Sequence, residues 1–92
     1  MGFFDLFKQV TFSGGDGTSE SNAVIVHTKS SLKGIPAEYS YIESKYGKRG
    51  LDWQLVEQTS LNSKSGKSLD LLTISLINGQ KVSVYFDISE FH

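Results

Sequence analysis

Apolar and polar residues alternate with a period of two along much of the last forty residues, which is typical of β-strands. The stretches LDWQLV, LDLLTISLI and KVSVYFD predict strands at 51–61, 69–77 and 81–87. Asn78-Gly79 separates the last two strands, and this pair is the strongest short-range signal for a β-hairpin. We therefore expect the three strands to form an antiparallel meander.

The register of this hairpin follows from the positions of its apolar residues. A two-residue turn at Asn78-Gly79 would mix apolar and polar side chains on each face. A three-residue loop with Gly79 in the left-handed region and a bulge pairs Leu72 with Val84, which makes one face uniformly apolar. We predict the bulged form, with an apolar face that comprises Trp53, Leu55, Leu72, Ile74, Leu76, Val82 and Val84. We also place Asp70 on this face, near a strand end, where its carboxylate can accept a hydrogen bond from a backbone amide.

The opposite face of the same strands is mixed in character. It would be either solvated or buried against a second subunit, a partner or the N-terminal segment. Its predicted members are Gln54, Val56, Gln58, Leu71, Thr73, Ser75, Ile77, Lys81, Ser83, Tyr85 and Asp87.

Residues 36–46 carry the spacing of an amphipathic α-helix. Pro36 suits the first helical turn, Glu38 favours the positive end of the helix dipole, and Gly47 is a natural C-terminal cap. The apolar stripe predicted to face the sheet consists of Ile35, Tyr39, Ile42 and Tyr46.

The first part of the chain contributes shorter elements. AVIVHT predicts a strand at 23–28, and its dense apolar run favours a place inside the sheet rather than at its edge. VTF predicts a short strand at 10–12, and SGGDGTSESN, which has no apolar residue, predicts a flexible loop at 13–22. The whole chain, 1–92, is expected to be a single α+β domain, a two-layer sandwich of one main helix on a largely antiparallel sheet.

Residues 1–9 form a separate feature. Phe3, Phe4 and Phe7 lie close together among polar residues, which predicts a short helix with one aromatic side. About two helical turns are not stable alone in water, so this helix must dock on something. We favour docking on its own domain; a partner protein and, less favoured, a membrane surface touched by residues 3–8 are the alternatives.

Composition removes several classes of function. The chain has 92 residues, a formal net charge of −1 and no cysteine. The charge balance gives no overall attraction to nucleic acid or acidic membranes, and the lack of cysteine excludes disulfides, thiolate nucleophiles and thiolate metal sites. No apolar run is long enough to span a bilayer, so we expect a cytoplasmic protein without a membrane span.

The residues that carry chemistry in other proteins do not form a known motif here. Gly66-Lys67-Ser68 resembles the end of a phosphate-binding loop, but the first glycine of that motif is replaced by Leu61 and a strand follows instead of a helix. His27 has no second histidine near it in sequence, and we interpret it as structural or solvated. We expect no enzymatic activity, no metal and no cofactor.

Two binding functions remain. The first is a protein-interaction or assembly module, acting on a protein partner or by self-association, with contact residues Phe3, Phe4, Phe7, Tyr41 and Tyr85. The alternative is a nucleic-acid or anion-binding domain that uses Lys45, Lys48, Arg49, Lys64 and Lys67.

Overall fold

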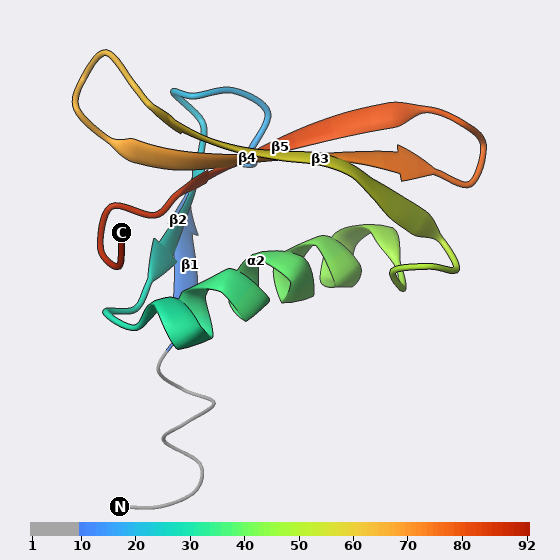
Figure 1. The fold of residues 1–92 in the computed structure, drawn as a ribbon, viewed down its shortest axis with the longest axis horizontal. Coiled ribbons are helices and arrows are strands. Elements are labelled where there is room, and N and C mark those ends of the chain that lie inside the picture. Colours follow the sequence, from blue (N-terminus) through green and yellow to red (C-terminus); the bar gives the residue numbers. More distant parts are fainter. Residues whose placement is uncertain (1–9) are drawn as a thin grey trace, which may run out of the picture.

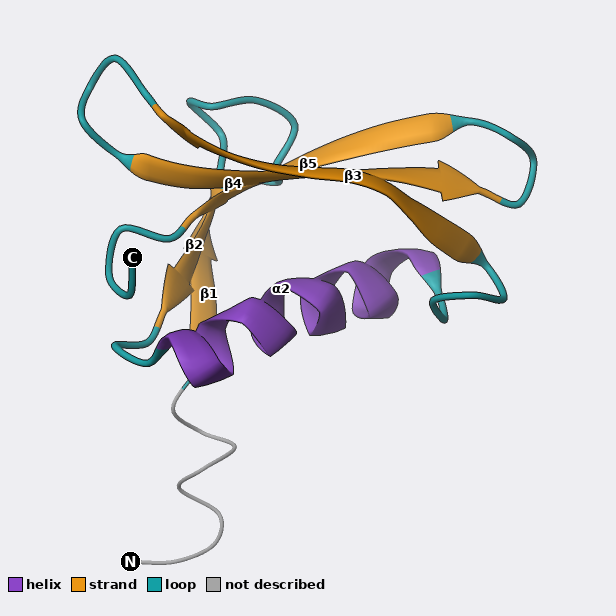
Figure 2. Ribbon diagram, viewed as in Figure 1, coloured by secondary structure: helices purple, strands orange, loops and turns teal. Residues whose placement is uncertain are grey.

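The computed structural model describes residues 10–92, which contain one α-helix and a five-stranded sheet. The predicted α+β class is confirmed, while the helix expected at 1–9 lies outside the described residues. The strands follow the order β1-β2-β5-β4-β3 across the sheet, and α2 crosses one of its faces (Figures 1 and 2). The elements are β1 (Thr11–Gly14), β2 (Val24–His27), α2 (Ser31–Tyr46), β3 (Trp53–Asn62), β4 (Ser68–Leu76) and β5 (Lys81–Asp87).

The strand β2 lies inside the sheet, as its apolar sequence indicated. It pairs antiparallel with β1 and parallel with β5. Val24 and Val26 point toward the helix layer and are buried, whereas Ile25 and His27 are half-buried on the other face. The strand expected at 10–12 is present as β1 and runs two residues further, and its pairing with β2 makes it the edge strand.

The β4–β5 hairpin has the predicted register. Leu72 lies opposite Val84 and Ile74 lies opposite Val82. Gly79 has a φ of 89°, and its N–H donates to the Leu76 carbonyl at 2.8 Å. The bulged loop is confirmed, and the side chains that point from this hairpin toward α2 form much of the core.

The pairing of β3 with β4 contains a bulge that the sequence pattern did not indicate. Trp53 and Leu55 pair as predicted, but the register shifts between Leu55 and Glu57. One extra residue in β3 reverses the direction of every later side chain. Gln58 therefore lies opposite Leu72 on the helix face, and its predicted place on the outer face was wrong.

The helix begins at Ser31, so the predicted start at Pro36 was wrong by five residues. Pro36 lies inside the helix, where its missing N–H leaves the carbonyl of Leu32 without its usual helical partner. Leu32 is largely exposed, so water can hydrate that carbonyl. The extra helical turn is held by packing, because Gly34 lies directly against the ring of Phe91, where no side chain would fit.

The earlier start also changes which helix face is buried. The buried helix residues are Gly34, Ala37, Glu38 and Ile42. Ile35 is exposed, so its predicted place on the buried stripe was wrong. Glu38 lies in the middle of the helix and faces the sheet, so the predicted role at the helix dipole was wrong as well.

The helix ends at Tyr46 with Gly47 as its C-terminal cap, as predicted, and the Gly47 position is sensitive to substitution. Gly47 has a φ of 102°, and a Cβ there would lie 2.3 Å from Oδ2 of Asp52, which accepts a hydrogen bond from the Lys48 N–H.

We expect Gly47→Ala to lower the free energy of unfolding by about 3 kcal/mol, because it adds a clash to backbone strain. Gly66→Ala is the matched control, since Gly66 has a φ of 89° but open space around it, and we expect a loss of about 1 kcal/mol. Urea unfolding followed by circular dichroism measures both, and equal losses would contradict the role of the Asp52 contact.

Candidate functional site: an apolar groove between β1 and α2

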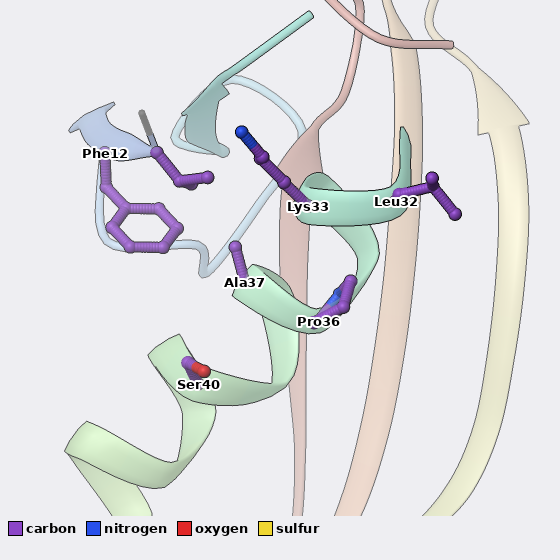
Figure 3. A pocket seen from close by; sticks show the side chains of 7 residues that line it. Phe12, Leu32, Lys33, Pro36, Ala37 and Ser40 are labelled. Carbon is purple, nitrogen blue, oxygen red and sulfur yellow. The ribbon is translucent and has the colours of Figure 1, made fainter. Parts of the chain in front are cut away.

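A groove of about 470 Å³ lies between β1 and the first turns of α2. Figure 3 shows Phe12 of β1 on one side and Ala37 and Ser40 of the helix on the other. Its volume falls in the range of ordinary ligand pockets. The lining residues are Val10, Phe12, Leu32, Lys33, Pro36, Ala37 and Ser40.

Helical periodicity explains the helix side of this groove. Residues 32, 33, 36, 37 and 40 recur at spacings of three and four, so they form one strip that faces the start of β1. On the strand side, Phe12 pairs with Val26, whose side chain is buried toward the helix layer, so Phe12 points the same way. The groove is therefore an extension of the core that β1 and α2 leave open to solvent.

Three aromatic rings connect the groove to the core. The ring centroids of Phe12 and Tyr41 are 5.3 Å apart, and those of Tyr41 and Phe86 are 5.6 Å apart with a T-shaped arrangement. Such geometry is favourable for aromatic pairs. Phe12 is partly exposed at the groove while Phe86 is fully buried, so Phe12 is held in place by packing from beneath.

The aromatic residues predicted to make contacts do not share one surface. Tyr41 is half-buried behind Phe12, on the helix side of the sheet. Tyr85 pairs with Leu71 on the opposite face and is also half-buried. Phe3, Phe4 and Phe7 lie outside the described residues.

The five basic residues of the alternative function fall into two groups. Lys45, Lys48 and Arg49 lie at the end of α2, and Arg49 bridges to Trp53 at the start of β3. Lys64 and Lys67 follow the other end of that ten-residue strand, about 30 Å away by strand geometry. The structure does not bring them into one basic patch.

Several of these basic side chains already contact other groups of the domain. The Arg49 guanidinium lies 4.9 Å from the Tyr39 ring centroid, and the Lys45 ammonium lies 5.9 Å from those of both Tyr41 and Tyr46. Lys64 and Lys67 line an open depression of about 550 Å³ with Glu20 at its rim. An acidic side chain there weakens the attraction for an anion.

The Gly66-Lys67-Ser68 tripeptide forms part of a turn, not a phosphate cradle. The Gly66 N–H donates to the Ser63 carbonyl at 3.0 Å, and the Ser63 N–H donates to the Lys67 carbonyl at 2.9 Å. Gly66 has the expected positive φ. Ser68 begins β4, so this loop leads into a strand and not into a helix.

A second unusual feature is a buried carboxyl pair between α2 and the sheet. Glu38 has no exposed surface, and among residues 10–92 neither oxygen of its carboxyl has a hydrogen-bond partner. Burial, and secondly the adjacent Asp70 carboxyl, raises the pKa of Glu38 to about 9. Glu38 is therefore protonated at neutral pH. Sequence reasoning missed this group because it placed Glu38 in the first turn of the helix.

The surroundings of Asp70 are polar. The Ser60 hydroxyl donates to Oδ1 of Asp70 at 2.7 Å, so the bond predicted from a backbone amide is instead made by a side chain of β3. The Tyr39 hydroxyl donates to Oε1 of Gln58 at 2.6 Å, on the same side of the sheet. Both contacts exist because the β3 bulge turns Gln58 and Ser60 toward the helix.

Within residues 10–92, no cluster of three or more histidine or acidic side chains is arranged to hold a metal ion.

No protein-family model, curated protein or solved structure matches this chain. No helix in the described part of the chain is long and apolar enough to cross a membrane. The function is therefore inferred from the surface of the domain and its chemistry. The β1–α2 groove combines an apolar lining with direct access from solvent, which is the usual character of a binding surface.

Proposed function

We propose that this domain is a protein-interaction module that self-associates by binding an aromatic segment in the β1–α2 groove. The observation that carries the proposal is the groove itself, in which Phe12, Leu32 and Pro36 are exposed to solvent beside a buried floor at Ala37. Apolar side chains that line an open groove gain free energy when a partner covers them.

The occupant that fits best is residues 1–9 of a second copy of the chain. These residues precede Val10, which lines the groove, and they include Phe3, Phe4, Leu6 and Phe7. A short amphipathic helix in an apolar groove is a common mode of recognition. The proposal thus pairs the most aromatic segment of the sequence with the apolar groove of the structure.

A second copy is favoured over the same chain because of the residues that join the segment to β1. Lys8, Gln9, Val10 and Thr11 contain none of the residues that favour a tight turn. Val10 and Thr11 are β-branched, which favours extended backbone. Extended backbone at Val10 and Thr11 favours contact of the preceding segment with a neighbouring molecule over contact with its own groove.

The expected affinity is modest. Each phenylalanine buries about 150–250 Å² when fully covered, and a reciprocal exchange of segments in a twofold dimer uses two grooves. The resulting interface is at the small end for stable protein pairs. Self-association is therefore expected at tens to hundreds of micromolar.

Sedimentation analysis of the full chain over this concentration range tests the proposal. The wild-type protein is expected to dimerise, while Leu32→Glu in the groove and Phe4→Glu in the segment are each expected to give monomers. The matched control is Ile77→Glu on the β4–β5 loop, because Ile77 (84% exposed) and Leu32 (87% exposed) are equally accessible. A chain that lacks residues 1–9 is expected to remain folded and monomeric.

Three results would count against this function. The first is a monomeric wild-type protein at the highest concentration. The second is loss of the dimer in Ile77→Glu, which would place the interface elsewhere. The third is unfolding of the shortened chain, which would make residues 1–9 part of the core.

The anion-binding alternative ranks second. It is supported by Lys64 and Lys67, which line one depression. Lys45, Lys48 and Arg49 would have to act at a separate location, since they lie at the other end of β3. A nucleic acid would need to span both groups.

A further inference from the structure

Three side chains on the outer face of the β1–β2 pair form a hydrogen-bonded relay. The Ser13 hydroxyl lies 2.5 Å from Nε2 of His27, and Nδ1 of His27 lies 2.6 Å from Oε2 of Glu90. Serine, histidine and carboxylate joined in this order are the arrangement that activates the nucleophile of serine hydrolases. The function proposed above does not use any of the three.

The two contacts determine how the protons are placed. An ionised carboxylate can only accept hydrogen bonds, so Nδ1 of His27 carries the proton and donates to Glu90. In the neutral ring Nε2 is then an acceptor, and the Ser13 hydroxyl donates to it. This tautomer is the one in which histidine can remove the serine proton.

The fold holds each member in place. Thr11 lies opposite His27 and Ser13 lies opposite Ile25, so Ser13 and His27 are diagonal neighbours on the face away from the helix. Glu90 follows β5, which pairs with β2. The segment that carries Glu90 is anchored by two backbone bonds, from the Ile88 N–H to the Ser68 carbonyl at 2.9 Å and from the Phe91 N–H to the Ile88 carbonyl at 3.1 Å.

We propose that Ser13 is a nucleophile that His27 activates and Glu90 positions, and that this relay transfers acyl groups from esters to water. In the first step Oγ of Ser13 attacks the ester carbonyl carbon while its proton moves to Nε2 of His27. The carbon–oxygen bond to the alcohol breaks, and His27 returns the proton to the leaving alkoxide. Water then attacks the acyl-serine, its proton passes through Nε2 back to Oγ, and the free acid leaves.

A backbone donor for the developing oxyanion is present beside the nucleophile. The Gly15 N–H bonds to the Ala23 carbonyl, so the next pair along the ladder, Gly14 and Val24, does not exchange backbone hydrogen bonds. The N–H of Gly14 therefore points off the free edge of β1. In many serine hydrolases the N–H of the residue after the nucleophile stabilises the oxyanion.

Exposure of the relay indicates the class of substrate. Ser13 is exposed, and the side chains of His27 and Glu90 are each 37% exposed. A site that opens directly to solvent suits a small, activated ester or an acyl group on the surface of a larger molecule. It does not suit a long acyl chain, which needs an apolar tunnel.

The relay and the groove lie on opposite faces of the same two strands, because Phe12 points toward α2 and Ser13 points away from it. The inference therefore does not rest on the proposed self-association. Substitutions in the relay are expected to leave the oligomeric state unchanged.

Covalent labelling of the full chain with an alkyl fluorophosphonate, followed by mass spectrometry of peptides, tests the inference. We expect one adduct, on Ser13, and none in Ser13→Ala. His27→Asn is expected to slow labelling by about 100-fold, the usual contribution of a general base. Glu90→Gln, which keeps the shape but removes the charge, is expected to slow labelling by at least about tenfold, and Glu90→Asp to restore part of the rate.

A second variant provides a readout that does not depend on ester chemistry. The chain has no cysteine, so Ser13→Cys introduces a lone thiol next to His27. Its alkylation by iodoacetamide at pH 7 is expected to be at least about tenfold faster than that of Ser21→Cys, an exposed control in the β1–β2 loop, because a neighbouring histidine favours the thiolate. Adding His27→Asn to the Ser13→Cys variant should remove the difference.

Clear results would overturn the proposal. If Ser13 forms no adduct, or if labelling persists unchanged in His27→Asn, the three side chains only stabilise the contact between β1, β2 and the segment after β5. Equal alkylation of the two thiol variants leads to the same conclusion. Thermal unfolding of each variant identifies those that fail to fold, and Glu90→Gln serves as the test if His27→Asn is among them.

Discussion

The Glu38→Gln variant is expected to be more stable than the wild-type protein at pH 8 by about 4 kcal/mol. The reason is that the folded protein holds the Glu38 carboxyl in its protonated form, with a pKa raised to about 9 by burial and by Asp70. The unfolded chain releases that proton near pH 4.5. Glutamine has a similar shape and remains neutral at every pH, so it removes this difference between the two states.

The direction of the pH dependence follows from proton binding. Between pH 4.5 and 9 the folded state binds one more proton than the unfolded state, so the free energy of unfolding decreases as pH rises. A full proton corresponds to about 1.4 kcal/mol per pH unit. The stabilising effect of the raised pKa is thus fully present below pH 4.5 and is lost as pH increases toward 9.

Urea unfolding at pH 5, 6, 7 and 8 measures the effect. The wild-type protein is expected to lose about 4 kcal/mol across this range, while Glu38→Gln changes little and the two proteins converge near pH 5. Glu57→Gln is the matched control, because Glu57 is exposed on β3 and should keep the wild-type slope. A Glu38→Gln variant with an unchanged slope would show that Glu38 is not the group that titrates.

The second large effect is expected for Trp53→Ala, with a loss of about 4 kcal/mol in the free energy of unfolding. Trp53 is 1% exposed and is the largest fully buried side chain of the core. Its indole N–H donates to the Gly47 carbonyl at 2.7 Å, so it joins the end of α2 to the start of β3. Removal of a large buried aromatic side chain typically costs 3–5 kcal/mol, because it leaves a cavity.

Two further variants separate packing from hydrogen bonding at this position. Trp53→Phe keeps most of the buried ring but loses the bond to Gly47, so a loss of about 2 kcal/mol is expected. Leu51→Ala, only two residues earlier, removes a side chain that is 72% exposed and should change stability by less than about 0.5 kcal/mol. Since Trp53 is the only tryptophan of the chain, unfolding must be followed by circular dichroism. A Trp53→Ala variant as stable as Leu51→Ala would contradict the packing described here.

The two faces of the β1–β2 pair carry different side chains, and each of the two functional proposals uses one of these faces. Phe12 contributes to an apolar groove suited to a second copy of the chain, whereas Ser13 belongs to a polar relay with His27 and Glu90. Adjacent residues of a strand point to opposite faces, so one four-residue strand serves both. Both proposals therefore depend on the position of β1 at the edge of the sheet.

The parts of the fold that were predictable from the sequence depend on neighbouring residues. The β4–β5 register followed from the Asn78-Gly79 turn and the alternation beside it, and the helix end followed from Gly47. The α+β class followed from the order of these local patterns. In each case the sequence pattern and the element that it predicts lie within a few residues of each other. Backbone sterics and turn hydrogen bonds are therefore enough to determine that element.

Several features that the local patterns did not indicate depend on contacts between distant residues. Phe91 packs against Gly34 and supports a helical turn before Pro36. The residues of that turn carry no pattern that predicts a helix. The bulge after Leu55 changed the direction of Gln58 and Ser60, and alternation alone predicts an uninterrupted strand there. His27 contacts Ser13 and Glu90, which are both remote from it in sequence, and its interpretation as structural or solvated stays a prediction. Among the candidate contact residues, Tyr41 and Tyr85 proved to lie on opposite faces of the sheet.

The sequence by itself determined the strands, the main helix, two glycine-dependent turns and the lack of cysteine chemistry, because each is set by short-range geometry or by composition. Only the tertiary structure decided that Glu38 would lie beside Asp70, that β1 and α2 would leave a groove, and that Ser13 would meet His27 and Glu90. The members of that relay are separated by 14 and 63 positions. Their distances depend on the order of strands in the sheet, which no local pattern specifies.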